Sequence, residues 1–153
     1  MGTGRKIFHR SFAGVSLGIV LAVACVVPCP VNAANTNTAA KREAASSQFA
    51  RAQEMRAALN EKAPEKRTLT DYKRVVTTYQ RVYLITPHAA EVPDAMVAVG
   101  ELNTEMGDRF GRSYYQAAAE AYQFLIREYP ASKFVPDAML RMAQLQKDQL
   151  GDP

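Results

Sequence analysis

Tryptophan is absent from this chain of 153 residues, and cysteine and histidine occur only twice each. His9 lies near the N-terminus and far in sequence from His88, and a single histidine in a turn is far more often a surface residue than a ligand of a catalytic zinc ion. Cys25 and Cys29 are separated by three residues near the N-terminus, and no histidine accompanies them. We therefore expect no metal site and, in the rest of the chain, no disulfide or thiol chemistry.

Other catalytic patterns are missing as well. No strand is predicted, so no glycine-rich phosphate loop can follow one. Serines and threonines have no neighbouring base in the sequence. Glu120 and Glu128 lie eight residues apart on a predicted helix, which is the spacing of a solvated face and not of an acid–base pair. The sequence therefore predicts a non-catalytic protein without a cofactor.

The chain begins with the pattern of an export signal. Three basic residues precede the first apolar run, namely Arg5, Lys6 and Arg10. Residues 12–27 carry no charge, and Ala33 offers a small residue for cleavage. This order is typical of a secretory signal peptide, so we expect residues 1–33 to be removed and the protein to leave the cytoplasm.

Two alternatives to simple cleavage remain open. The segment Leu21-Ala22-Val23-Ala24-Cys25 resembles a bacterial lipobox, in which Cys25 is acylated and becomes the mature N-terminus. The segment can also stay uncleaved as an anchor, although its apolar run of about 16 residues is shorter than the roughly 20 that a membrane span needs. In each case the chain meets the membrane only through its signal or a lipid anchor.

Most of the basic charge lies in the segment that we expect to be removed. The formal net charge is +4, and the three basic residues of the signal supply most of it. The remaining chain is close to neutral, so we expect no nucleic-acid partner. Residues 41–82 hold ten Lys or Arg against five acids, whereas residues 83–153 hold six against ten. This distribution is typical of solvated helix faces.

One segment occurs twice in the chain, at a shift of 43 residues. Residues 92–96 and 135–139 share the sequence Val-Pro-Asp-Ala-Met. The same shift superposes matched tyrosines and prolines, with Tyr72 on Tyr115, Tyr79 on Tyr122 and Pro87 on Pro130. A fixed period of 20 to 50 residues made of paired helices is typical of an α-solenoid. The tyrosines recur at helical spacing, so we expect most of them in the core.

Five helices are predicted from the apolar stripes and the residues that interrupt them. The pattern Thr68-x-x-Asp71 is a capping box that starts the second helix, and prolines occupy the first turns of the third and fifth. We expect Gly107 to end the third helix in the left-handed conformation and a loop to follow over residues 107–113. The predicted helices cover residues 39–62, 69–85, 92–106, 114–129 and 136–150.

The repeat resembles the tetratricopeptide repeat, a pair of antiparallel helices. The resemblance rests on the pattern Met96-x-x-Val99-Gly100-x-x-Asn103, then Gly107-Asp108, Ala118-x-x-x-Tyr122 and Pro130. In that family the glycine lets two helices approach closely, the alanine lets the returning helix pack, and the proline ends the unit. The resemblance implies a right-handed α-solenoid over residues 46–153, with five helices and an incomplete last pair. Residues 34–45 then form a spacer and the start of the first helix.

The stretch from Tyr122 to Lys133, followed by Asp137 and Ala138, is similar to repeats of bacterial envelope proteins. These include the tetratricopeptide lipoprotein of the outer-membrane β-barrel assembly machine and the periplasmic coordinator of the Tol-Pal system. The resemblance implies a scaffold at the periplasm or outer membrane that binds a protein or peptide, including peptidoglycan-associated machinery. The repeat region that precedes the catalytic domain of some N-acetylmuramoyl-L-alanine amidases is similar too. The alternative is therefore the regulatory or wall-targeting region of such an amidase, with its catalytic domain outside these residues. A third possibility is a purely structural spacer that binds no ligand in a groove.

In tetratricopeptide stacks the leading helix of each pair lines the concave surface. This implies a groove formed by outward positions of the third and fifth helices: Asp94, Val97, Glu101, Glu105, Asp137, Leu140, Gln144 and Asp148. Five of the eight are acidic, so we expect a partner segment that carries Lys or Arg and makes apolar contacts at Val97 and Leu140. An ordinary hydrated helix surface is the alternative explanation of the same charges.

We expect the exported protein to begin at or near Ala34, because Val31 and Ala33 form the better cleavage site. Intact-mass measurement of the protein from membrane and soluble fractions tests this. A mature chain that starts at Cys25 and carries a diacylglycerol would contradict cleavage at Ala33 and would identify a lipoprotein.

Overall fold

The computed structural model describes residues 32–151, with side chains from residue 36 onward. Five α-helices follow one another: α1 (Asn32–Glu61), α2 (Leu69–Ile85), α3 (Val92–Phe110), α4 (Ser113–Glu128) and α5 (Val135–Leu145). A 3-10 turn, η1 (Pro64–Lys66), follows α1, and a π-helical turn, η2 (Gln146–Leu150), extends α5. The described part contains no strand, which confirms the predicted all-α class. Cys25 and nearly all of the expected signal peptide lie outside it.

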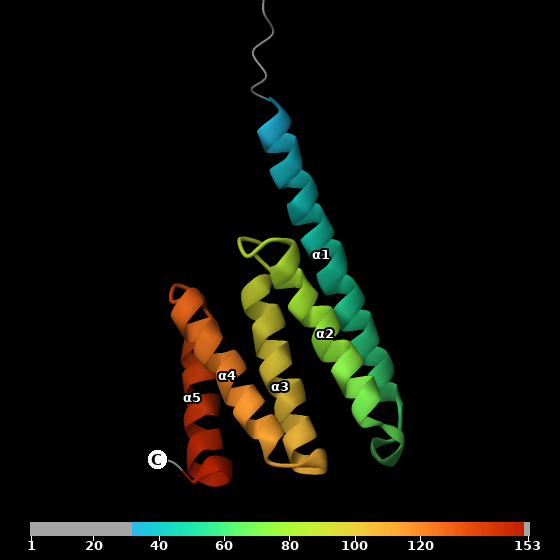
Figure 1. The fold of residues 1–153 in the computed structure, drawn as a ribbon, viewed down its shortest axis with the longest axis vertical. Helices are drawn as coiled ribbons and strands as arrows, with labels where there is room; N and C mark the ends of the chain where they lie inside the picture. The colour runs from blue at the N-terminus through green and yellow to red at the C-terminus, as the bar shows by residue number, and fades with distance from the viewer. Residues whose placement is uncertain (1–31, 152–153) are drawn as a thin grey trace, which may run out of the picture. The chain divides into compact units, whose positions relative to one another are not determined.

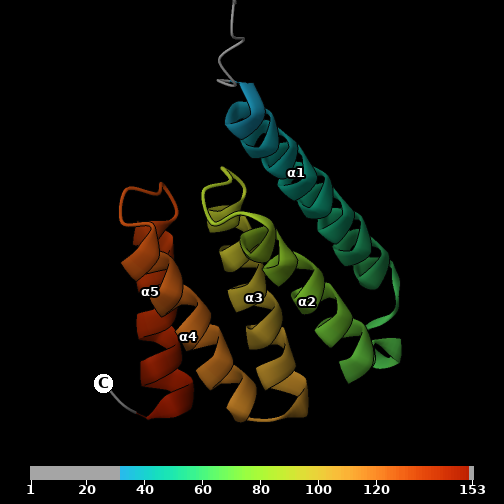
Figure 2. The same ribbon diagram turned by 45° about the horizontal axis from the view of Figure 1, so that its top comes forward.

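Consecutive helices pack side by side and run in opposite directions (Figures 1 and 2). The helices α2, α3, α4 and α5 lie next to one another in chain order and form a bundle, and the N-terminal half of α1 extends past its neighbour α2 (Figure 1). The helix α3 lies in the middle of the row and has buried side chains around most of its circumference, in contrast to α5. The core of the protein is therefore centred on α3.

The start of α2 follows directly from its sequence. Thr68 is the N-cap, and its side chain accepts a hydrogen bond from the backbone N–H of Asp71. In return the Asp71 carboxylate accepts one from the backbone N–H of Thr68 at 3.0 Å. Lys62 and Thr68 donate hydrogen bonds that lower the pKa of Asp71 to about 2. The predicted capping box is confirmed.

The tyrosines on the repeated stripes lie in the core, as the spacing predicted. Tyr72, Tyr79, Tyr115 and Tyr122 are all less than a tenth exposed. Phe49 of α1 packs edge-to-face against Tyr79 of α2, with ring centroids 5.8 Å apart. Aromatic pairs in this arrangement add to the stabilisation that burial gives. The rings therefore join successive helices and are not free to form an exposed aromatic surface.

Two glycines of α3 are in contact with tyrosine rings of α4. A Cβ added to Gly100 would lie 2.5 Å from ring atoms Cε1 and Cζ of Tyr122, and one added to Gly107 would overlap the ring of Tyr115. The prediction that Gly107 ends α3 is therefore wrong, because this glycine is required for close approach inside the helix. The helix continues to Phe110, and the positive φ of 127° belongs to Gly111.

The predicted boundaries of α1 and α5 also need correction. The helix α1 begins at Asn32, so the residues expected to form a polar spacer are helical. Residues 34–45 are rich in alanine and lack glycine and proline, and alanine has the highest helix propensity of all residues. The last predicted helix keeps its length but changes from α to π geometry after Leu145.

Replacing Gly100 by alanine should make the protein less stable. Overlap of the added methyl group with a packed ring costs about 1–3 kcal/mol of the free energy of unfolding. The gain of roughly 1 kcal/mol that alanine gives in a helix interior offsets only part of this cost. Urea unfolding followed by circular dichroism measures the difference. The matched control is Ala143→Gly, 43 residues on in the exposed part of α5, where only the propensity loss is expected. A Gly100→Ala variant more stable than the wild type would contradict the close-contact role of Gly100.

Candidate functional site

A chain of ion pairs connects α1, α3 and α5 on one face of the bundle. Glu101 of α3 contacts Arg56 of α1 at 2.9 Å and Arg141 of α5 at 3.4 Å. Arg56 also contacts Glu105 at 3.3 Å, and Arg141 contacts Asp137 at 2.6 Å. Three of the five predicted groove acids are therefore paired with arginines of the same chain, and they are not the main source of attraction for a cationic partner.

The other predicted groove residues lie in different surroundings. Asp94 is partly buried, which raises the pKa of its carboxyl, while the charge of Lys133 opposes this rise. Val97 is only 8% exposed, so the prediction that it faces outward is wrong. It lies one helical turn before Gly100, on the side of α3 against which α4 packs. Leu140, in contrast, is 57% exposed on α5.

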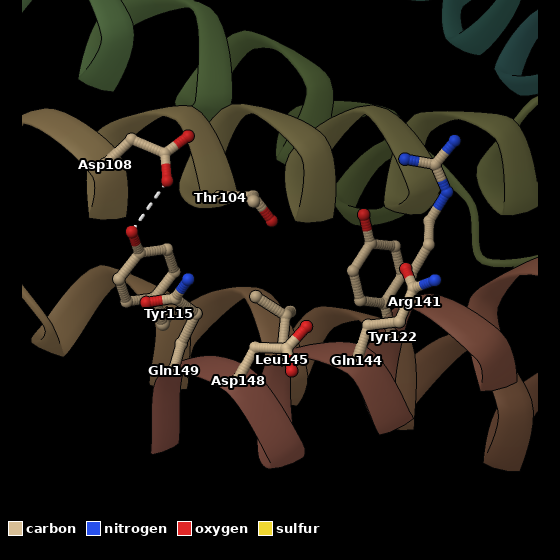
Figure 3. A pocket seen from close by; sticks show the side chains of 9 residues that line it. All are labelled: Thr104, Asp108, Tyr115, Tyr122, Arg141, Gln144, Leu145, Asp148 and Gln149. Carbon is tan, nitrogen blue, oxygen red and sulfur yellow. Dashed lines mark hydrogen bonds between the residues drawn. The ribbon is translucent and has the colours of Figure 1, made fainter. Parts of the chain in front are cut away.

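The last two predicted residues, Gln144 and Asp148, line a cleft of about 200 Å³ between α3 and α5. This α3–α5 cleft takes its lining from three helices and η2: Thr104 and Asp108, Tyr115 and Tyr122, and Arg141, Gln144, Leu145, Asp148 and Gln149 (Figure 3). Both tyrosine rings lie between the two helices, with their hydroxyls directed toward α3 (Figure 3). The cleft adjoins the ion pairs, because Arg141 belongs to both.

Hydrogen bonding and burial keep both phenols of the cleft protonated. The hydroxyl of Tyr115 donates to Oδ1 of Asp108 at 2.6 Å, and this bond raises the pKa of Tyr115 above its ordinary value of 10.0. Burial raises the pKa of Tyr122, and Arg141 and Thr104 partly oppose the rise. At neutral pH the two hydroxyls are therefore hydrogen-bond donors and do not serve as bases.

The polar groups around these rings suit the binding of a cation or a peptide amide. Asp108 and Asp148 bring carboxylates to opposite walls of the cleft (Figure 3). Within residues 36–151 Asp148 forms no ion pair, and the amides of Gln144 and Gln149 form no hydrogen bond with another side chain. These three groups can therefore bind a ligand without breaking an internal interaction.

Sequence reasoning missed the two arginines and the role of the tyrosine hydroxyls. Arg141 follows Asp137 by four residues, a spacing at which opposite charges meet on a helix surface, so this pair was open to prediction. The contact between Arg56 and Glu101 joins residues far apart in the chain and leaves no local signal. The tyrosines were assigned to the core, but the cleft lies directly against their rings.

Comparison with known proteins adds no constraint on the site. No family model matches this chain, and no curated protein or solved structure matches it. Within the described residues no helix has the length and apolar character needed to cross a membrane. The same residues contain no group of three or more His, Cys, Asp or Glu side chains placed to hold a metal ion.

Replacing Asp108 by asparagine should lower the pKa of Tyr115 toward 10.0, because the negative charge that stabilises the protonated phenol is lost. The wild-type hydrogen bond contributes stability that is present below pH 10 and is lost as the pH rises through the raised pKa of Tyr115. NMR of ring-labelled tyrosine follows the titration, with Tyr115→Phe for assignment. Asp148→Asn is the control and should have the smaller effect. An unchanged pKa in Asp108→Asn would contradict the assigned cause.

Proposed function

We propose that this chain is a non-catalytic scaffold that binds an extended protein segment carrying Lys or Arg. The observation that carries the proposal is the α3–α5 cleft, where Asp148, Gln144 and Gln149 are not engaged by other side chains of residues 36–151. An extended backbone needs hydrogen-bond donors and acceptors at its sides, which two amides supply. A lysine or arginine side chain needs a carboxylate, which Asp148 supplies.

The architecture that we propose is a right-handed stack of tetratricopeptide-like helix pairs. The pairs are α1 with α2 and α3 with α4, and α5 is the leading helix of the next unit. The repeat of 43 residues supports this pairing. Further support comes from the contact between Gly100 of α3 and Tyr122 of α4, which joins the two helices of one unit at the positions that the family pattern assigns.

The leading helices of such a stack share one surface, and the ion pairs suggest where it lies. Arg56, Glu101 and Arg141 come from α1, α3 and α5 and meet on one face. We place the bound segment along this face, with its cationic side chain in the α3–α5 cleft. Glu101 then holds the two neighbouring helices in position and does not bind the partner directly.

The proposed setting is the bacterial envelope, in assembly or wall remodelling. It rests on the export pattern of residues 1–33 and on the resemblance of the repeat to envelope proteins. An exported chain in this setting reaches partners of the periplasm, including the machinery that acts on peptidoglycan.

A short fluorescein-labelled peptide of Gly, Ser and Lys tests the binding proposal, with a second peptide in which glutamine replaces each lysine. The lysine peptide should bind more tightly, and Asp148→Lys should weaken its binding at least about threefold, as expected for a partly exposed charge pair. Added salt should weaken binding as well, because exposed charges are screened over about 10 Å at 0.1 M ionic strength. Fluorescence anisotropy measures the affinities.

The matched control is Glu120→Lys, the same charge change in the hollow between α2 and α4 and outside the α3–α5 cleft. It should leave the affinity unchanged. Equal affinities for the lysine and glutamine peptides, or equal losses in the two variants, would contradict the proposed site. Glu101 is avoided in this test, because its replacement would leave Arg56 and Arg141 without their shared partner.

A further inference from the structure

A second hollow lies between α2 and α4, and residues of α3 form its floor. Its volume of about 450 Å³ is within the range of roughly 300–1,000 Å³ that small-molecule sites have in proteins. Its walls come from three consecutive helices in the middle of the described chain, so it does not lie at an end of the helix row. It shares no lining residue with the α3–α5 cleft. We call it the α2–α4 hollow.

The walls of the hollow are mainly apolar, and one end of it is aromatic. Val99 and Met96 of α3 are buried residues of the floor. Tyr83 of α2 and Phe124 of α4 both line the hollow and pack edge-to-face, with ring centroids 5.2 Å apart. Aromatic rings make favourable contacts with the edges of other rings and with methionine sulfur. The walls therefore suit a flat aromatic molecule.

One buried polar side chain reaches the hollow from its floor. Asn103 of α3 lines the hollow and is only 6% exposed. Its Nδ2 donates a hydrogen bond to the carbonyl oxygen of Val99 at 2.8 Å, but its Oδ1 accepts none from residues 36–151. Within that range every fully enclosed side-chain nitrogen or oxygen has a partner. The free oxygen of Asn103 is therefore not sealed in the core but open to the hollow.

The free oxygen and the charge at the mouth determine the chemistry of a ligand. Buried polar groups in native proteins are nearly always hydrogen-bonded, so Oδ1 of Asn103 requires a donor. Glu120 lies exposed at the mouth of the hollow and forms no ion pair within the described residues. Its charge repels another carboxylate, which disfavours an anionic amphiphile such as a fatty acid. The ligand is therefore neutral and carries an N–H or O–H group.

We propose that the α2–α4 hollow is a binding site for a small neutral aromatic molecule with an N–H donor, the chemistry of an indole. Asn103, Val99 and Met96 follow one another along the floor at intervals of one helical turn. The N–H donates to Oδ1 of Asn103, and the ring lies over Val99 beside Met96. The Gly, Ser and Lys peptide that tests the α3–α5 cleft has no aromatic group, so it does not fill this hollow.

Indole and benzofuran are matched probes for this site, because benzofuran has the same shape but a ring oxygen in place of the N–H group. NMR titration of the ¹⁵N-labelled protein measures the affinity of each probe. Indole should bind about fivefold more tightly than benzofuran, the factor expected for one neutral hydrogen bond. The side-chain amide signals of Asn103 should shift in the indole titration, and Asn103→Leu identifies them by their loss.

Variants of the protein locate the ligand in the hollow. Asn103→Leu removes the acceptor, so indole and benzofuran should then bind with equal affinity. Ala117→Leu adds a larger side chain to the α4 wall and should weaken both probes about tenfold or more, because it occupies the hollow. Ala143→Leu is the matched control, the same change at an exposed position of α5 outside the hollow, and should leave both affinities unchanged. Circular dichroism checks that each variant is folded.

Four results would overturn the proposal. The first is no binding of indole at millimolar concentration, and the second is equal affinity of the wild type for the two probes. Both need only the wild type, so they decide even where Asn103→Leu does not fold. The third is unchanged indole binding in Ala117→Leu, which would place the ligand elsewhere. The fourth is tighter binding of an end-blocked Gly-Trp-Gly peptide than of indole, which would assign the hollow to a side chain of a partner protein. Preference for indole that only Asn103→Leu abolishes would support the proposal.

Discussion

The close contact between α3 and α4 is the constraint on which the other features depend. Gly100 and Gly107 expose backbone where other residues have a side chain, and the rings of Tyr122 and Tyr115 occupy that space. A tyrosine buries on the order of 150–250 Å², so each ring contributes a few kcal/mol from burial alone. The same rings form the floor of the α3–α5 cleft, where the hydroxyl of Tyr115 binds Asp108. Core packing and cleft chemistry therefore use the same side chains.

The ion pairs across α1, α3 and α5 have a different role from the aromatic contacts. Their side chains are all at least a fifth exposed, and pairs of this kind are worth about 0.2–1 kcal/mol each. Their effect lies in the distribution of charge. Because Arg56 and Arg141 neutralise Glu101 and Asp137, the carboxylates of Asp108 and Asp148 are left to determine the electrostatic character of the cleft beside them. The number of acids on this face is therefore a poor guide to the charge that a partner meets.

The sequence allowed the helices to be predicted well because the signals at their ends are local. The Thr68–Asp71 capping box places the start of α2 correctly, since its hydrogen bonds join residues three apart. Gly107 was misassigned because glycine is common both at helix ends in the left-handed conformation and inside helices at close contacts. The presence of glycine in the sequence does not distinguish these two roles. Val97 was placed in the groove because a helical wheel gives its direction but not the neighbour that covers it. The partners of Arg56 and the shape of the cleft depend on contacts between distant residues, which no spacing rule supplies.

The two copies of the repeat separate what a sequence dictates from what its neighbours dictate. Met96 and Met139 follow the same Val-Pro-Asp-Ala sequence, yet one is 6% and the other 53% exposed. Burial is thus a property of the surrounding helices, and an isolated exposed methionine would require no explanation. The case of α5 is different, because Leu140 beside it keeps the apolar character of Val97, and Ala143 keeps a small side chain at the position of Gly100. The exposed side of α5 therefore keeps the apolar pattern that α3 buries. The polar residues of the cleft and the exposed side chains of Met139 and Leu140 thus give α5 two sides of opposite chemistry.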